Sequence, residues 1–575
     1  MDLLTEFSDH SSRAKPQEDV EINHVYIELT LKSGIRFASF GTLEVKPESC
    51  LKSNPFQIQG ILFVPALTKD GERVVVISPQ IHQLDNVIEL LSAYPLLKAK
   101  TVLVTRNYFE RLILTGTGVV GLVSRKPEIS AFQGLTAEQK LFFAGVPLAY
   151  FVGNIVTWSI LFLSVFTAIK LIAISIGLMR LYATLEVPKF TGHSSQIDEW
   201  PTYTVLVPLF NEPQICKQLT DAMRALDYPK KKLELYFLVE EEDHDTQLAL
   251  DANKASYMSI FVVPKGSPQT KPRALQTVLR KCQGEFLTVY DAEDRPEPDQ
   301  LKKSVGAFRR LPEDYACLQA SLCIDHAQKG WLLRQFAFEY AGLFDVMLPW
   351  LARWQVFLPL GGTSNHFKRS ALQKVGGWDP FNVTEDADLA VRLMRNRYKI
   401  GVLKSTTYEE APTTLKAWLS QRSRWHKGWI QTMAVHLRNP LLLFKELGLV
   451  NSIVFMIYFV GGMLCLWFGP LTLISLLGLL VVFAFSNELT TPIPLLLSPF
   501  GLLGILSVLI GFGGPVLSIY AGARRRNLSP KVWELVTIPV YWLLASYASY
   551  QALWEFFMRP HHWRKTRHGL VSRPM

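Results

Sequence analysis

The chain has 575 residues, of which 49% are hydrophobic and only 19% are charged. Soluble proteins usually carry about 25% charged residues, so this composition excludes a disordered chain, and six cysteines are too few for a disulfide scaffold. The net charge of +10 is spread along the chain, which favours contact with anionic membrane lipid and argues against nucleic acid as a partner. We therefore expect a membrane protein with a large aqueous part.

Residues 1–135 are predicted to form a small cytosolic module of the α/β or α+β type. The sequence indicates strands over His24–Leu31, Arg73–Ile77 and Lys100–Thr105, and a helix over Asp85–Tyr94 that Pro95 ends. No catalytic signature lies in this module. Its part from Val75 to Leu114 resembles the N-terminal module of type II secretion ATPases, which implies regulation or the docking of an accessory protein.

A long apolar stretch follows, from Leu141 to Met179, with Lys170 as its only charged residue. One membrane crossing needs about 20 residues, and this stretch is about twice that length. We therefore predict a transmembrane hairpin over residues 136–182.

Residues 438–560 are predicted to form about four further membrane helices, followed by a basic cytosolic tail over 561–575. Their apolar stretches are Asn451–Phe485, Leu489–Ala523 and Leu535–Trp554. Two crossings before the polar middle and four after it place the middle and both ends on the cytosolic side of the plasma membrane. This count leaves Arg524–Arg526 outside, against the tendency of basic residues to stay inside. One pass fewer in the first stretch, or one more in the second, would return them, so the number of crossings stays open.

Residues 183–437 alternate apolar strands with helical stretches. The strands are Tyr203–Leu209, Leu233–Val239, Met258–Val263 and Phe286–Tyr290. This order predicts βαβ units and a mostly parallel sheet. Ligands of such a sheet bind at the carboxyl ends of its strands.

Polar motifs follow the first two of these strands. The first runs into Asn211-Glu212 and the second into Glu240-Glu241-Glu242-Asp243. An acid at a strand end accepts hydrogen bonds from the base or ribose in other nucleotide folds, while a helix cap or a solvated loop explains these residues equally well. Lys271 and Arg273 stand at the start of a helix, where two cations oppose the helix dipole unless they meet a phosphate.

The fourth strand ends in Asp291-Ala292-Glu293-Asp294. Acids at alternate positions bring carboxylates to one strand end, where they can share a hard divalent cation through oxygen ligands. Mg²⁺ or Mn²⁺ at this point would hold a diphosphate and neutralise the charge of a leaving group. A capped turn before the next helix is the alternative interpretation.

Two later motifs complete the set. Thr384-Glu385-Asp386 begins a predicted helix, and a carboxylate there can deprotonate an incoming hydroxyl, although a helix cap is the alternative. In Gln421-Arg422-Ser423-Arg424-Trp425 the tryptophan offers a stacking face and the arginines offer a fork for phosphate. The surrounding Leu415–Leu437 is apolar on one side and basic on the other, so an anchoring helix at the bilayer surface explains it equally well.

In this order the motifs resemble glycosyltransferase family 2, in its membrane-embedded branch with the cellulose, hyaluronan and chitin synthases. The resemblance covers about residues 200–435. Tyr290–Leu301 (YDAEDRPEPDQL) and Thr384–Leu389 (TEDADL) are similar to strings in bacterial biofilm glycosyltransferases of the XagB type. The resemblance implies a GT-A-like α/β catalytic domain embedded in an α-helical transmembrane bundle.

The resemblance also implies roles for individual residues. Asp386 and Asp291 are the expected catalytic residues, the first as the base and the second as a metal ligand. Glu293 falls on the second metal position, where it replaces the family's Asp, so Asp294 is an alternative ligand. The remaining expected substrate-binding residues are Glu241 or Glu240 for the uracil, together with Lys271, Arg273, Glu385, Gln421, Arg424 and Trp425.

The implied activity is an inverting transfer of a hexose from a nucleotide sugar, UDP-glucose or a similar donor, with Mg²⁺ or Mn²⁺ as cofactor. The product would be a growing exopolysaccharide, of the kind found in biofilms, which the membrane helices export. Non-processive transfer to a lipid acceptor is the alternative, because it uses every motif up to Asp386. A non-catalytic binding component and a transporter fit less well, because the set of acidic motifs is complete and the apolar stretches hold almost no ionisable residues.

Overall fold

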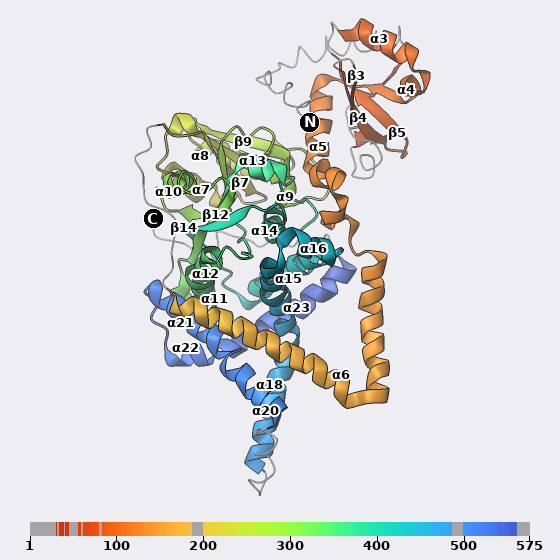
Figure 1. Ribbon diagram of the computed structural model, residues 1–575. Helices are drawn as coiled ribbons and strands as arrows, with labels where there is room; N and C mark the ends of the chain where they lie inside the picture. Colours follow the sequence, from red (N-terminus) through yellow and green to blue (C-terminus); the bar gives the residue numbers. More distant parts are fainter. Residues whose placement is uncertain are drawn as a thin grey trace.

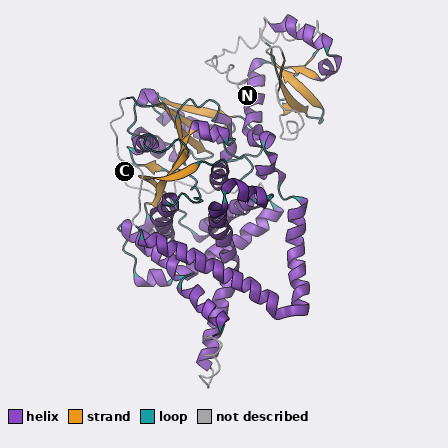
Figure 2. Cartoon of the chain, viewed as in Figure 1, coloured by secondary structure: helices purple, strands orange, loops and turns teal. Residues whose placement is uncertain are grey.

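The computed structural model describes residues 30, 34–38, 41–44, 56–58, 61–79, 83–186, 199–485 and 498–559. Within these ranges the chain forms a small N-terminal module, a central α/β domain and a set of long apolar helices (Figure 1 and Figure 2). The predicted strand His24–Leu31, apart from Thr30, and the predicted tail 561–575 lie outside the described residues.

The N-terminal module is built on a six-stranded sheet in the order β1-β6-β5-β4-β2, with β3 paired to β4. Its strands are β1 (Arg36–Phe37), β2 (Leu43–Glu44), β3 (Phe56–Ile58), β4 (Ile61–Thr68), β5 (Arg73–Ile77) and β6 (Thr101–Leu103), and its helices are α3 (Leu84–Ala93), α4 (Pro95–Lys100) and α5 (Arg106–Arg125). The predicted strand Arg73–Ile77 is β5, and the predicted helix Asp85–Tyr94 corresponds to α3. Figure 1 shows α5 leading from this module to the central domain.

An eight-stranded mixed sheet in the order β11-β14-β12-β13-β10-β7-β8-β9 forms the centre of the second domain. Its strands are β7 (Tyr203–Leu209), β8 (Leu233–Glu240), β9 (Met258–Val263), β10 (Phe286–Val289), β11 (Arg295–Pro296), β12 (Tyr315–Ile324), β13 (Asn365–Lys368) and β14 (Lys399–Glu409). The four predicted strands, β7 to β10, pair in parallel. The short β13 runs antiparallel between β10 and β12, so the sheet is mixed rather than wholly parallel.

Helices cover both faces of this sheet. They are α7 (Cys216–Arg224), α8 (His244–Asn253), α9 (Lys271–Val278), α10 (Gln300–Phe308), α13 (Arg369–Lys374) and α14 (Glu385–Arg395). A further group lies at the carboxyl edge of the sheet and comprises α11 (Trp331–Gly342), the π-helix η8 (Leu343–Met347), α12 (Leu348–Arg353), α15 (Leu415–His436) and α16 (Pro440–Leu447). Apolar side chains of β7 and β8 are buried between the helix layers, as near-continuous apolar strands require.

The apolar helical region comprises α6 (Ala137–Leu185), α17 (Leu449–Val454), the π-helix η9 (Phe455–Val460), α18 (Gly461–Phe485), α20 (Pro499–Leu509) and α21 (Gly513–Arg525). The short α17 and η9 run directly into α18. Three segments of the described residues are long and apolar enough to cross a membrane: Ser164–Leu185, Leu449–Ile474 and Pro499–Arg525. This is fewer than the six crossings that the sequence predicts.

The predicted hairpin over residues 136–182 is one helix, α6, which turns back on itself (Figure 1). Both of its ends contact the central domain. Near the first end, Gln139 Nε2 donates a hydrogen bond of 2.6 Å to the carbonyl oxygen of Ala434. At the second end, Arg353 Nη1 lies 3.1 Å from Glu186 Oε2. Both ends of α6 therefore lie against the central domain, and one part of the helix, Ser164–Leu185, is a candidate span among the described residues.

The predicted last crossing over Leu535–Trp554 falls on two helices of the structure. Its residues form the end of α22 (Val532–Val536) and most of α23 (Ile538–Met558), and α23 is not among the candidate spans. The two ends of this stretch lie against the central domain, since Trp331 Nε1 donates to Thr537 Oγ1 at 2.9 Å and Lys427 Nζ donates to the carbonyl oxygen of Arg559 at 3.5 Å. A face of small residues, with Ala545, Ala548 and Ala552 buried, lets α23 pack closely on α15, while Val540 and Trp554 are exposed.

The tertiary contacts also place the basic triplet Arg524–Arg526 at the end of α21. Arg526 forms an ion pair with Asp345 of η8, and Arg525 Nη2 donates to the carbonyl oxygen of Glu186 at 3.3 Å. These arginines therefore lie on the side of the central domain. The sequence left the number of membrane crossings open. A single crossing in Asn451–Phe485 agrees with the placement of these arginines.

Candidate active site

A cavity of about 230 Å³ opens between the carboxyl ends of β7, β8 and β10 and the helices α11 and α15. Nine of the residues singled out from the sequence line it: Glu240, Lys271, Asp291, Glu293, Glu385, Asp386, Gln421, Arg424 and Trp425. Three others, Glu241, Arg273 and Asp294, are not among its lining residues. The motifs therefore meet where the parallel-sheet argument expects a ligand.

Lys271, the first residue of α9, is the cation at the centre of this cavity. Its Nζ donates to Asp291 Oδ1 at 2.5 Å and to the carbonyl oxygen of Gly362 at 2.7 Å, and it lies 3.6 Å from Glu385 Oε1. Burial by itself would lower the pKa of Lys271, but the attraction of the neighbouring carboxylates raises it. The ammonium group therefore stays charged.

The turn after β10 presents two carboxylates to the cavity and buries a third. Asp294 Oδ2 accepts hydrogen bonds from the backbone N–H of Asp291, at 2.7 Å, and from the hydroxyl of Thr363. Asp294 is 1% exposed, and burial together with the charges of its acidic neighbours raises its pKa well above the usual range. Asp294 thus shapes the turn, and it is not among the residues that line the cavity.

Within the described part of the chain, no group of three or more His, Cys, Asp or Glu side chains is arranged to hold a metal ion. Asp291 and Glu293 nevertheless supply two oxygen donors at the same edge of the cavity. Mg²⁺ commonly takes one or two protein carboxylates and completes its shell with water and substrate phosphate. The donor set therefore fits such an ion shared with a diphosphate.

Asp386 lies in the first turn of α14, and its Oδ1 accepts a hydrogen bond of 2.8 Å from the N–H of Ala387. Burial, reinforced by the negative charge of Glu385, raises the pKa of Asp386 to about 7. The Arg424 guanidinium also lies near Asp386, Glu385 and Asp291. Burial lowers the pKa of Arg424, and the negative charges of these acids partly offset that effect. A carboxylate with a pKa near neutrality suits a general base.

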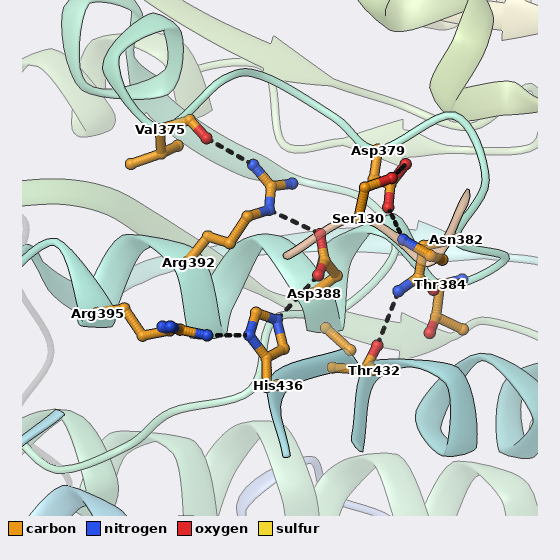
Figure 3. Close-up of polar contacts among 12 residues, drawn as sticks. Ser130, Val375, Asp379, Asn382, Thr384, Asp388, Arg392, Arg395, Thr432 and His436 are labelled. Carbon is orange, nitrogen blue, oxygen red and sulfur yellow. Dashed lines mark hydrogen bonds and ion pairs between the residues drawn. The ribbon is translucent and has the colours of Figure 1, made fainter. Parts of the chain in front are cut away.

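A buried polar network holds α14 in place (Figure 3). Arg392 Nε donates to Asp388 Oδ2 at 2.7 Å, and Arg395 Nη1 donates to His436 Nδ1 at 3.0 Å. His436 therefore carries its proton on Nε2 and donates it to Asp388 Oδ1 at 2.9 Å. Burial would raise the pKa of Asp388, but Arg392 and His436 hold it below the usual range. The network joins α14 to α15, which carries Gln421 and Arg424.

The start of α14 is held by further contacts seen in Figure 3. Asn382 Oδ1 accepts from the N–H of Thr384, and Asn382 Nδ2 donates to Thr432 Oγ1, both at 3.0 Å. The side chain of Thr384 forms no capping hydrogen bond. Thr384 therefore does not cap α14 through its side chain, although Asp386 accepts a hydrogen bond from a first-turn N–H.

Replacing Asp388 by Asn is expected to lower the free energy of unfolding by about 3 kcal/mol, because it leaves the fully buried Arg392 without its counter-charge. Thermal unfolding of the detergent-solubilised protein measures this change. Asp314→Asn is the matched control, since Asp314 forms a half-exposed ion pair with Lys399 whose loss changes stability by less than about 1 kcal/mol. Equal melting temperatures for the two variants would contradict the role of the network.

The structure separates Glu241 from its neighbour Glu240. The two terminal nitrogens of Arg111 in α5, Nη1 and Nη2, donate to the Glu241 carboxylate, and the N–H of Lys265 donates to it at 3.1 Å. Glu240 lines the cavity instead, and its Oε2 accepts from Arg273 Nη2 at 2.6 Å. The predicted diphosphate contact of Arg273 does not fit, because Arg273 is fully buried beneath Glu240.

The docking of the N-terminal module beside the site was not predicted. Besides the Arg111 contact, Asp379 Oδ2 accepts from the N–H of Ala131 at 2.6 Å, and Arg438 donates to backbone carbonyls of residues 127–134. No local sequence pattern signals these pairs, since their members lie 100 or more positions apart. The module therefore contacts both the residue that follows β8 and the segment before α14.

Comparison with known proteins agrees with this geometry. Residues 201–428 match the model of the family described as "Glycosyltransferase like family 2". The chain is 28% identical over 263 residues to the probable glycosyltransferase YdaM of Bacillus subtilis, covering 44% of this chain and 60% of that protein. It is 29% identical over 297 residues to the beta-monoglucosyldiacylglycerol synthase of Synechocystis, covering 48% and 60%.

A third relative is the probable glucomannan 4-beta-mannosyltransferase 1 of Arabidopsis thaliana, 24% identical over 274 residues, with 45% of this chain and 49% of that protein covered. The chain thus spans about half to three-fifths of the length of these curated relatives. Among solved structures, the chain is similar to the mannosyltransferase PcManGT of Pyrobaculum calidifontis, in complex with GDP-Man and Mn²⁺. The alignment covers 63% of this chain and all of that chain, with 18% identity and a TM-score of 0.39. This likeness is too low to carry an argument. Residues 201–428 form a glycosyltransferase family 2 domain, and the prediction of a glycosyltransferase enzyme is confirmed at the level of this domain.

Proposed function

We propose that this chain is an inverting, membrane-embedded glycosyltransferase that moves a hexose from a nucleotide sugar, UDP-glucose or a similar donor, onto a growing polysaccharide. The observation that carries the proposal is the position of Asp386. This carboxylate lines the same cavity as Asp291 and Glu293, and its raised pKa lets it accept a proton near neutral pH.

The donor end of the cavity is suited to a nucleoside diphosphate. Asp291 and Glu293 would hold Mg²⁺ or Mn²⁺, and the bound ion would offset the negative charge of the diphosphate as it leaves. Lys271 and Arg424 provide further positive charge in the same cavity. Glu240 lies at the carboxyl end of β8, where an acid can accept hydrogen bonds from the base.

Transfer then needs a single proton acceptor. The acceptor hydroxyl oxygen attacks the anomeric carbon in line, the bond from this carbon to the diphosphate oxygen breaks, and the hydroxyl proton moves to the Asp386 carboxylate. The nucleoside diphosphate leaves with the electron pair of the broken bond. Because no covalent sugar–enzyme intermediate forms, the configuration at the anomeric carbon inverts and no second carboxylate has to flank the bond.

The contacts of the apolar helices support a multi-pass protein of the plasma membrane with a cytosolic active site. Both ends of α6 and the end of α21 lie against the central domain, which places Arg525 and Arg526 on that side. Basic residues favour the cytosolic side. The spans would provide the exit path for the polymer, and the N-terminal module would serve as a regulatory or docking unit for an accessory protein.

Transfer to a lipid acceptor is a second candidate function. Three relatives carry the name beta-monoglucosyldiacylglycerol synthase, and the cavity lies next to the membrane helices. A lipid product would require the same donor chemistry and a different acceptor. The relatives therefore support the family chemistry and leave both acceptors to experiment.

Label incorporation from a panel of UDP-sugars and GDP-sugars tests the proposal. Membranes carrying the wild type are expected to incorporate one sugar into a high-molecular-weight product when Mg²⁺ or Mn²⁺ is present, and membranes carrying Asp386→Asn are not. A chloroform-soluble product would favour the lipid acceptor. Failure of every donor to be hydrolysed or transferred would overturn the proposed function.

The rate of transfer is expected to rise with pH up to about 7 and then to level off. Asp386 must be deprotonated to act as a base, and its pKa is raised to about 7 by burial and by Glu385. One pH unit below that value only about a tenth of the enzyme carries the active carboxylate, so kcat/KM at pH 6 should be about tenfold below its plateau. A flat profile between pH 6 and pH 8 would contradict the assignment of the base.

A further inference from the structure

Three consecutive glutamates at the end of β8 each pair with a different cation. The pairs are Glu240 with Arg273, Glu241 with Arg111 and Glu242 with Lys265. Glu240 lines the cavity, and Glu241 is not among its lining residues. Arg111 belongs to α5 of the N-terminal module, so this module holds the residue directly next to a carboxylate of the active site.

Hydrogen bonds also join Glu241 to Glu240 through the segment that follows β9. The N–H of Lys265 donates to Glu241 Oε2 at 3.1 Å. Arg273 Nη1 donates to the carbonyl oxygen of Pro264 at 2.8 Å, and Arg273 Nη2 donates to Glu240 Oε2 at 2.6 Å. Because Arg273 is fully buried in close-packed surroundings, a shift of residues 264–265 would move the group that holds Glu240.

The helix α5 presents Arg111 from a packed position. Its Leu122 is buried in one apolar cluster with Ile129 and with Phe381 and Val435 of the central domain. A Cβ atom at Gly376 would lie 2.8 Å from Leu122 Cδ1, so the backbone at Gly376 lies directly against α5. Apolar packing between domains restricts their relative motion. Arg111 therefore reaches Glu241 from a fixed direction.

We infer that Arg111 is a positioning residue of the donor site, because its guanidinium fork holds Glu241 and thereby sets the end of β8 so that Glu240 faces the nucleotide base. This inference rests on the proposed function and deepens it, since it makes the N-terminal module part of the machinery that binds the donor. Arg111 is not among the residues that line the cavity, so it acts through Glu241. Two parallel N–H···O bonds fix the angle of a carboxylate as well as its distance.

The exposure of the pair indicates which property depends on it. The side chains of Arg111 and Glu241 are 29% and 34% exposed. Ion pairs at the surface contribute little to the free energy of unfolding. Loss of the pair should therefore leave the melting temperature nearly unchanged, while the end of β8 loses an anchor and the donor binds more weakly. A change in the KM for the donor without a matching change in stability separates positioning from a general role in folding.

The test uses the full-length protein in lipid nanodiscs with the donor sugar found active in the panel. Arg111→Gln is expected to raise the KM for the donor about 3-fold to 30-fold, with kcat at saturating donor within about twofold of the wild type. Calorimetry with Mn²⁺ and UDP, or GDP if the panel selects a GDP-sugar, should show the dissociation constant of the nucleotide rising by the same factor. Arg111→Lys keeps the charge and loses the fork, so its donor KM should lie between those of the wild type and Arg111→Gln.

Two further variants make the outcome decisive. Glu241→Gln should raise the donor KM as Arg111→Gln does, and the double variant should bind the donor no more weakly than the weaker single variant, since both changes remove one pair. Arg36→Gln is the matched control, because Arg36 donates through two nitrogens to Glu72 within the module, and it should change neither kcat nor KM.

Three results would overturn the inference: an unchanged donor KM in both single variants, additive effects in the double variant, or a lower donor KM in Arg111→Gln. A wild type that neither hydrolyses nor transfers any donor would instead overturn the proposed function itself.

Discussion

Replacing Asp386 by Asn is expected to lower kcat by about 10³-fold while the KM for the nucleotide sugar changes only a few-fold. The side chain keeps its shape and loses its capacity to accept the hydroxyl proton, and general base catalysis contributes about 10²–10⁴-fold. The position of Asp386 at the start of α14, away from the turn after β10, explains why donor binding should persist. Initial rates of label transfer at saturating donor measure the effect.

The stability of the same variant shows whether the loss is chemical or structural. The pKa of Asp386 is about 7 in the folded protein and about 4 in the unfolded chain, so the folded state binds a proton more tightly between these values. Stability therefore falls as pH rises from about 4 to about 7, and the charged carboxylate is unfavourable above that range. The neutral Asn removes this effect, so Asp386→Asn should melt at a higher temperature than the wild type at pH 8 and at the same temperature near pH 4. A variant that keeps more than a tenth of the wild-type kcat would contradict the role of the base.

Replacing Asp291 by Asn is expected to lower transfer by about 10²–10³-fold and to weaken the dependence on divalent metal. Asp291 is one of the two carboxylates that would hold the ion, and it is also the hydrogen-bond partner of Lys271. Removing its charge weakens the hold on the metal and leaves Lys271 with less compensation. Titration of Mn²⁺ in the presence of UDP, followed by calorimetry, measures the metal affinity directly.

Asp299→Asn is the matched control for the Asp291 variant. It removes the same charge from a half-exposed carboxylate that pairs with Lys303, so it should leave both the activity and the metal titration within about twofold of the wild type. An Asp291→Asn protein with the wild-type metal affinity would show that the ion, if it binds, is held elsewhere.

The central domain shows how far local sequence reasoning reaches. The apolar run Tyr203–Leu209 is β7 with the predicted bounds, because its β-branched and apolar residues suit a strand buried on both faces. The motifs that follow such strands meet at one edge, since parallel strands end on the same side. Lys271, Asp291 and Asp386 therefore come together, as their positions in the chain predict.

Neighbouring residues at a strand end are harder to separate. Glu240 and Glu241 have the same chemistry, but successive side chains at the end of a strand point in opposite directions. Only the packing of α5 shows which of the two glutamates faces the cavity, because Arg111 of α5 forms an ion pair with Glu241. The role of Asp294 depends in the same way on a distant partner, the hydroxyl of Thr363.

By itself the sequence determined the family of the central domain, the strands of its parallel core and nine of the residues that line the cavity, because these depend on local apolar patterns and on motifs at strand ends. The tertiary structure decided what the apolar helices pack on and where their ends lie. The helix α23 packs on α15 with both of its ends held by the central domain, while Val540 and Trp554 are exposed. The docking of the N-terminal module beside the site likewise depends on contacts between residues far apart in the chain, which no local pattern encodes.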